Sequence, residues 1–171
     1  SRALGLGEVL VRKDLGMISG SGKPKIGHEV GQLRSQLEKI LHFSNTTAAV
    51  VIGAGKLGSA IRDYGGFAEY GVHITAAFDN DPQKIGRRSY AAPIYPMEQL
   101  KTHCLSHNVR IAILTVPAGQ AQSVCEQAIA AGVDAIWNFA PTRLQVPANI
   151  RVSNENLATS LAILAMQIPS D

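Results

Sequence analysis

The glycine-rich segment 53–58 has the residue types and spacing of a turn that binds phosphate between a strand and a helix. Its residues are Gly53, Ala54, Gly55, Lys56, Leu57 and Gly58, and they follow the apolar run Ala48–Ile52. In a dinucleotide-binding turn, the first glycine permits the bend, the second lets the backbone approach a pyrophosphate, and the third lets the helix pack on the sheet. The helix N-terminus then offers free N–H groups to the anion. Glycines present only for packing are the competing interpretation.

Asp79 ends a second apolar run, Val72–Phe78, at the expected position of the second parallel strand of a βαβ unit. A carboxylate there accepts hydrogen bonds from both ribose hydroxyls and repels a 2′-phosphate, which favours NAD(H) over NADP(H). Asp81 is an alternative ribose-binding residue, with Asp79 then acting as a cap. Arg87 and Arg88 follow in the sequence and are candidates for binding a 2′-phosphate, so the choice between the two dinucleotides stays open.

The sequence shows no set of side chains suited to hydride-transfer catalysis or to metal binding. An oxidoreductase needs a general acid or base and groups that orient the substrate beside the nicotinamide. His103 and His107 are one helical turn apart, but no third ligand accompanies them. Tyr95 is the phenol best placed near the expected cleft, where it would stack on or bond to the nicotinamide instead of transferring a proton. We therefore expect a binding protein that is not an enzyme and has no metal site.

A parallel α/β sheet would position these residues, and the alternation of apolar runs with helical patterns predicts one. Strands are expected at 48–52, 72–78, 93–95, 109–116 and 135–139, with helices after the glycine turn, at 97–107 and at 118–131. Ligands of open α/β sheets bind at the carboxyl ends of the strands. This rule nominates Thr115, Val116, Pro117, Asn138 and Phe139 as cleft residues.

The C-terminal segment 156–170 carries no charged residue, and its predicted helix has apolar side chains on nearly every face. Such a helix must be buried almost all round. One domain can cover only part of it, so we expect a homodimer in which this helix is exchanged or inserted. A helix lying in a groove of its own sheet is the alternative.

The N-terminal quarter holds the whole excess of positive charge in the chain. Residues 1–45 contain seven Lys and Arg and four Asp and Glu, so their net charge of +3 equals that of the whole chain. Two amphipathic helices are expected in this segment. This is where an anionic partner such as DNA would bind, although a solvated surface would look the same. No apolar run is long enough to cross a membrane, and the two cysteines are expected to be reduced, so we predict a cytoplasmic protein.

Several motifs together resemble the Rex family of redox-sensing transcriptional repressors. They are the glycine turn with Ser59 and Ala60, the stretch Ala77–Gly86, Ile113–Pro117, Asn138–Pro141, and Val11–Leu15, which is similar to the start of the recognition helix of a winged-helix domain. The resemblance covers nearly the whole chain. It implies a homodimer that binds NAD(H), senses the NADH/NAD⁺ ratio and releases operator DNA when NADH binds.

The resemblance also implies roles for single residues. Arg12 and Lys13 would contact double-stranded DNA from the recognition helix, Lys23 and Lys25 would lie in the wing, and Tyr95 would lie near the nicotinamide. The full set of candidate cofactor-binding residues is Gly53, Ala54, Gly55, Lys56, Leu57, Gly58, Asp79, Asn80, Tyr95, Thr115, Val116, Pro117, Asn138, Phe139 and Ala140. Residues 1–45 would be the remnant of the winged-helix domain with a linker, 46–153 the Rossmann domain and 154–171 the exchanged dimerisation helix.

The chain departs from the family pattern in three ways. Where the family usually has aromatic residues after the recognition helix and in the wing, this chain has Met17, Ile18, Ser21 and His28. Asn156 stands where an aspartate is common, and the chain begins inside the expected helix-turn-helix, as in a truncated or diverged member. An NAD-dependent oxidoreductase, or a Rossmann subunit that binds CoA or another nucleotide, is the alternative function, because the fold alone does not fix the activity.

Overall fold

The structure is a computed structural model that describes residues 9, 13, 31, 46–86 and 92–168. The chain divides into two units, Ser1–Thr46 and Thr47–Asp171. Of the residues expected to contact DNA, Lys13 is helical and exposed, whereas Arg12, Lys23 and Lys25 lie outside the described residues. Arg87 and Arg88 also lie outside them.

The second unit is built on a six-stranded sheet with the strand order β3-β2-β1-β4-β5-β6, in which every neighbouring pair is parallel. The strands are β1 (Thr47–Ile52), β2 (Val72–Asp79), β3 (Ile94–Pro96), β4 (Val109–Leu114), β5 (Ala135–Asn138) and β6 (Arg151–Asn154). This is the order of a Rossmann fold, with a reversal between β1 and β4 where a cleft opens at the carboxyl ends of the strands. The predicted parallel α/β sheet is confirmed.

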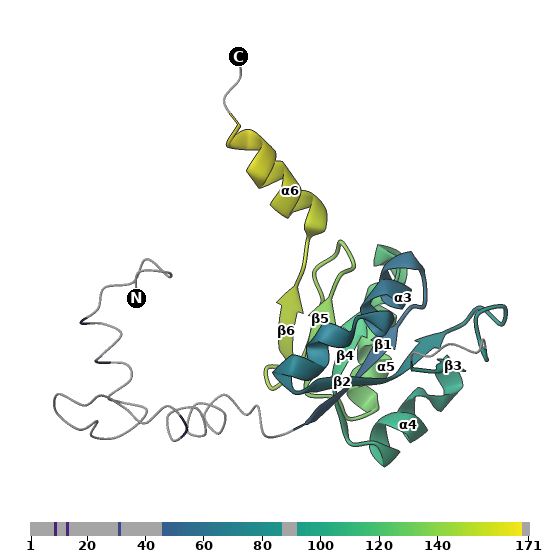
Figure 1. Cartoon of the computed structure of the whole chain (residues 1–171). Helices are drawn as coiled ribbons and strands as arrows, with labels where there is room; N and C mark the ends of the chain where they lie inside the picture. The colour runs from purple at the N-terminus through teal and green to yellow at the C-terminus, as the bar shows by residue number, and fades with distance from the viewer. Residues whose placement is uncertain (1–8, 10–12, 14–30, 32–45, 87–91, 169–171) are drawn as a thin grey trace. The chain divides into compact units, whose positions relative to one another are not determined.

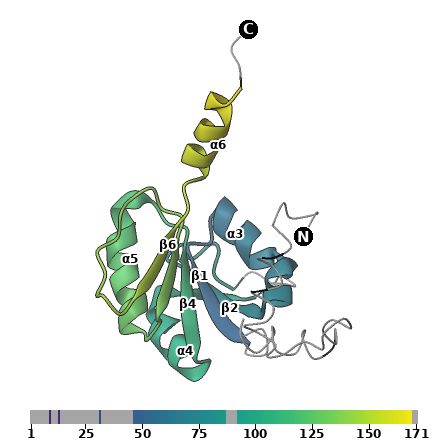
Figure 2. The ribbon, with the colours of Figure 1, turned by 90° about the vertical axis from the view of Figure 1, so that its left-hand side faces the viewer.

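Helices cover both faces of this sheet, as Figures 1 and 2 show. The helix α3 (Lys56–Asp63) and the 3₁₀ helix η2 (Gly65–Tyr70) follow β1 and pack on one face through Ile61 and Phe67. The helices α4 (Leu100–Ser106) and α5 (Ala118–Ala130) pack on the other face. Because β1 and β4 are buried on both faces, their sequences are almost continuously apolar instead of alternating.

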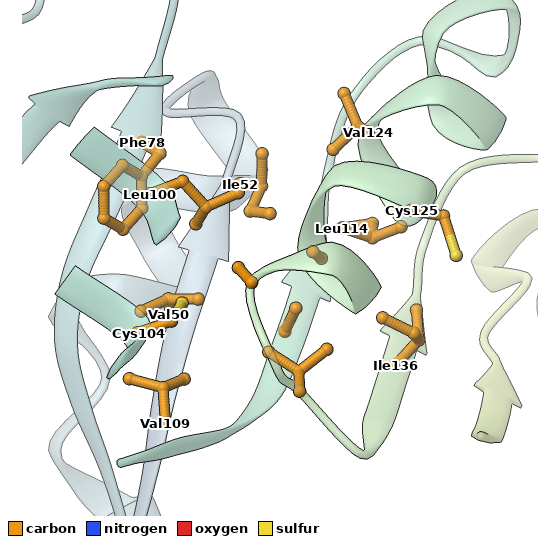
Figure 3. Close-up of a cluster of buried hydrophobic side chains, with 14 of the residues drawn as sticks. Val50, Ile52, Phe78, Leu100, Cys104, Val109, Leu114, Val124, Cys125 and Ile136 are labelled. Atoms are coloured by element: carbon orange, nitrogen blue, oxygen red, sulfur yellow. The ribbon is translucent and has the colours of Figure 1, made fainter. Parts of the chain in front are cut away.

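The larger of the two hydrophobic clusters lies between the sheet and the helices α4 and α5. Figure 3 shows many of its side chains. Ile52, Phe78 and Leu114 come from three neighbouring strands and are almost fully buried. Both cysteines, Cys104 of α4 and Cys125 of α5, are buried thiols of this cluster. This packing fixes the carboxyl ends of β1, β2 and β4 relative to one another, and these ends carry the candidate site.

Two elements were not predicted from the sequence. The strand β6 was missed because its residues are mostly polar and exposed, so no apolar run marks this edge strand. The 3₁₀ helix η2 begins with two glycines, which do not favour a helix. The predicted helix 97–107 is a 3₁₀ turn, η3 (Met97–Gln99), followed by α4.

The last helix, α6 (Leu157–Met166), presents apolar side chains that nothing in the described chain covers. Leu161 is 67% exposed and Met166 is 86% exposed. The side chain of Asn156 caps this helix, because its Oδ1 accepts a hydrogen bond from the N–H of Thr159 at 2.9 Å. Among the described residues, no helix is both long and apolar enough to span a membrane.

Candidate functional site

A cavity of about 690 Å³ opens at the carboxyl ends of β1, β2 and β4, where the topology predicts a ligand. Seven of the predicted site residues line it: Gly53, Gly55, Asp79, Asn80, Thr115, Val116 and Pro117. Asp81, the alternative ribose-binding residue, also lines it, as do six residues without a predicted role: Ile52, Phe78, Lys84, Met97, Gln120 and Val124. The cavity therefore joins the glycine turn, the end of β2 and the start of α5.

The glycine turn is held tightly against the β4 loop. Gly53 has φ of +98°, and a Cβ on it would lie 2.8 Å from the carbonyl oxygen of Thr115. A Cβ on Gly58 would lie only 1.8 Å from the carbonyl oxygen of Gly53 and 2.6 Å from Oγ1 of Thr115. The hydroxyl of Thr115 donates to that same Gly53 carbonyl at 2.7 Å. Gly53 and Gly58 are thus required by the packing of the turn.

Gly55 differs from the other two glycines, because a Cβ on it would have no neighbour within 4 Å. It is the N-cap of α3, lines the cavity, and has φ of −74°, which any residue adopts. No side chain caps α3, and Lys56 and Leu57 in its first turn are exposed. The space above Gly55 and the uncapped helix end are suited to an anion such as a pyrophosphate. Ala54 is buried beneath the turn.

The carboxylate of Asp79 connects the glycine turn to the turn after β2. Its Oδ2 accepts hydrogen bonds from the N–H of Ala54 at 2.7 Å and from Nζ of Lys84 at 2.9 Å. Its Oδ1 accepts a hydrogen bond from the N–H of Asp81 at 2.9 Å. Burial raises the pKa of this carboxyl, but the N–H groups and the Lys84 ammonium outweigh burial, so the net shift is downward. Asp79 is therefore a fixed carboxylate at the cavity wall, whereas Asp81 caps the turn.

Other predicted residues lie away from this cavity. Asn138 is fully buried and its amide bonds within the loop after β5, donating to the carbonyl oxygen of Thr142 and to Oδ1 of Asn154, each at 2.9 Å. Phe139 packs on Trp137, with ring centroids 4.6 Å apart. Tyr95 of β3 contacts the rings of Phe78 and His103. Their contacts in this structure are thus with the protein itself.

Ala140 lies at a second cavity of about 450 Å³, beside the carboxyl ends of β5 and β6. Pro141, Thr142, Arg143, Asn154, Glu155 and Asn156 also line this second cavity. It adjoins the start of α6, so the residues that cap α6 and those that end β5 share one surface.

Lys84 is the charged residue of the cavity wall to which the sequence alone assigned no role. It follows Asp79 by five positions in a turn, where no periodicity specifies which way a side chain points. Its charge was the only feature of the sequence that could have indicated a role, because a lysine five positions after a carboxylate can form an ion pair with that carboxylate. Among the described residues, no group of three or more His, Cys, Asp or Glu is placed to hold a metal ion.

Comparisons with known proteins give a domain match and a set of relatives that share one name. Residues 44–142 match the family model described as a CoA binding domain. The chain is 41% identical over 165 residues to the redox-sensing transcriptional repressor Rex of Treponema denticola, covering 96% of this chain and 79% of that protein. It is 39% identical to Rex of Carboxydothermus hydrogenoformans, covering all of this chain and 82% of that protein.

Solved structures give the same result. The crystal structure of RSP in complex with β-NAD⁺ and operator DNA is similar with a TM-score of 0.88 and 31% identity, over 98% of this chain and 77% of that chain. The structure of RSP, a Rex-family repressor, in complex with β-NADH has a TM-score of 0.81 and 30% identity, over 98% of this chain and 78% of that chain.

Proposed function

This chain belongs to the Rex family of redox-sensing transcriptional repressors, and from that premise we propose that NADH and NAD⁺ compete for its main cavity and control its binding to operator DNA. The protein is an NADH- and NAD⁺-sensing transcriptional repressor and not an enzyme. The observation that carries the proposed site is the cavity in which an open Gly55 and a fixed Asp79 carboxylate face one ligand space.

In this proposal, the pyrophosphate lies over Gly53–Gly58 and is bound by the free N–H groups at the start of α3. Asp79 and Asn80 contact the adenosine ribose from the end of β2. Thr115, Val116 and Pro117 border the other half of the dinucleotide, beyond the end of β4. Ala140, Phe139 and the backbone of Asn138 extend this border toward the second cavity, with Tyr95 as a further ring near the site.

The apolar surface of α6 supports a homodimer in which this helix packs against the partner. Leu161, Leu164 and Met166 are each more than half exposed, so burying them against a partner would remove apolar surface from water and stabilise the helix. A second copy supplies the matching surface, because exchange of an identical element is a common route to dimers. Replacing Leu161 with Glu is expected to convert the dimer to monomer in analytical ultracentrifugation, whereas Glu at the exposed Gln127 of α5 is the control with the same added charge.

The DNA-binding part of the proposal assigns residues 1–45 to a winged-helix domain with a linker, 46–153 to the cofactor domain and 154–171 to the dimerisation helix. Arg12 and Lys13 would contact the operator from a recognition helix, and Lys23 and Lys25 from a wing. NADH would change the spacing between the two recognition helices of the dimer and so release the DNA, in the cytoplasm where operator and dinucleotide meet.

The proposed cofactor is tested by titrating NADH, NAD⁺ and CoA separately into the chain and measuring each dissociation constant calorimetrically. CoA is included because the matching family model is a CoA binding domain. Tighter binding of NADH than of CoA is the expected result. Tighter binding of CoA would replace the proposal with a CoA-binding subunit.

A further inference from the structure

We propose that Lys84 is a specificity-determining residue, so that the Asp79–Lys84 pair, and not Asp79 alone, sets how strongly the cavity prefers NADH over NADPH. This inference rests on the proposed function, because it assigns a role at the adenosine ribose of a bound dinucleotide. Lys84 lies outside the glycine turn, and the pattern of that turn assigns it no role in cofactor binding.

The position of the Lys84 ammonium carries the proposal. Both residues line the cavity, and Nζ of Lys84 lies 2.9 Å from Oδ2 of Asp79 and 3.7 Å from Oδ2 of Asp81. The Lys84 side chain is 33% exposed, whereas that of Asp79 is 12% exposed. Among the described residues that line the cavity, Lys84 alone carries a positive charge. The carboxylate is fixed, and the cation beside it keeps access to the ligand space.

The hydrogen bonds of Asp79 show what a ribose would meet. A carboxylate offers about four lone-pair sites. The N–H groups of Ala54 and Asp81 and the ammonium of Lys84 take three of these sites, and both bonds on Oδ2 are among them. A ribose diol donates to both oxygens of such a carboxylate. The second of these bonds therefore requires Lys84 to leave Oδ2, so NADH and Lys84 compete for the same acceptor.

A 2′-phosphate has the opposite relation to this pair. Asp79 repels it, but the ammonium of Lys84 can turn from Oδ2 to the phosphate over a short distance and form a charge-assisted hydrogen bond. Lysine is suited to this movement because its ammonium is a compact charge on a flexible stem. Lys84 therefore partly offsets the rejection of NADPH by Asp79, while it weakens the contact of Asp79 with NADH.

The test measures dissociation constants of NADH and NADPH for the wild-type chain, Lys84→Met, Lys84→Arg and Lys101→Met. Methionine keeps much of the length of lysine without its charge. Lys101 is an exposed residue of α4 that does not line the cavity, so Lys101→Met removes the same charge elsewhere. Lys84→Met is expected to raise the ratio of the NADPH to the NADH dissociation constant about tenfold, or about 1.4 kcal/mol. Lys84→Arg and Lys101→Met should keep the wild-type ratio within about twofold.

A ratio that Lys84→Met leaves within twofold of wild type would overturn the role of Lys84, provided that the wild-type chain binds NADH. A ratio that Lys101→Met raises as much as Lys84→Met would overturn it too, because the effect would then be one of net charge. Failure of the wild-type chain to bind either dinucleotide would overturn the proposed function, and this inference with it.

Discussion

Gly58→Ala and Gly55→Ala should separate the two roles of the glycine turn. A Cβ on Gly58 would lie 1.8 Å from the carbonyl oxygen of Gly53, a backbone atom that cannot move without opening the turn. It would also lie 2.6 Å from Oγ1 of Thr115, whose hydroxyl bonds to that carbonyl. A Cβ on Gly55 would have no neighbour within 4 Å. Gly58→Ala should therefore damage the fold, and Gly55→Ala should damage only ligand binding.

The size of the Gly58 effect follows from these contacts. Overpacking of this kind costs about 1–3 kcal/mol. Loss of the Thr115 hydrogen bond adds about 1 kcal/mol. Alanine offsets about 1 kcal/mol of this through its better helix propensity. We expect a net loss of about 1–3 kcal/mol, which lowers the melting temperature by about 2–4 °C for each kcal/mol in a chain of this size.

Urea unfolding of each variant measures the free energy of unfolding, and calorimetric titration of NADH measures the ligand affinity. Gly55→Ala should keep the wild-type stability within about 0.5 kcal/mol. Its methyl group would occupy the open space above the turn and should weaken NADH at least tenfold. Equal stability of Gly58→Ala and wild type would refute the packing role of Gly58. Unchanged NADH affinity in Gly55→Ala would refute the assignment of that space to the pyrophosphate.

Three further predictions concern the core and the loop after β5. Asn138→Ala should lower the free energy of unfolding by about 3 kcal/mol, because the substitution leaves the buried N–H of Ala140 without its acceptor. Thr142→Ala should change the free energy of unfolding little, since Thr142 contributes only a backbone carbonyl to this loop. Burial raises the pKa of the Cys104 thiol to about 11 and also raises the pKa of the Cys125 thiol. Neither thiol should therefore react with a thiol reagent at pH 8 before the protein unfolds. Rapid labelling of the native protein would contradict the burial of these two cysteines. Burial and the neighbouring His107 lower the pKa of His103, so the folded state disfavours protonation of this histidine. The stability that the neutral histidine contributes should be complete above about pH 6.5 and should decline as the pH falls below that value. His103→Gln should therefore reduce the slope of the unfolding free energy against pH between pH 7 and pH 5.

The sheet could be predicted from the sequence because buried parallel strands leave continuous apolar runs. The predicted runs 48–52 and 72–78 differ from β1 and β2 by one residue at a single end. The edge strand β6 could not be predicted in this way, because Arg151–Asn154 is largely exposed and its position depends on pairing with β5. Periodicity reports burial, so it finds central strands and misses exposed ones.

Prediction of the site had the same kind of limit. The glycine turn and Asp79 were found because their positions depend on the backbone, at the ends of β1 and β2. Asn138 also follows from the rule of strand ends, yet its amide is taken up by the loop after β5, a contact that depends on side-chain direction. Lys84 was missed because its reach to Asp79 depends on the shape of a turn.

Release of operator DNA by NADH is the most direct test of the central claim. A fluorescent duplex carrying the operator of RSP would be bound to the chain at one fixed salt concentration, since affinity for DNA depends strongly on salt. NADH and NAD⁺ would then be titrated separately while the anisotropy of the duplex is recorded. The account predicts that NADH lowers the anisotropy to that of free DNA and that NAD⁺ at the same concentration does not. Equal anisotropy at saturating NADH and saturating NAD⁺ would contradict it.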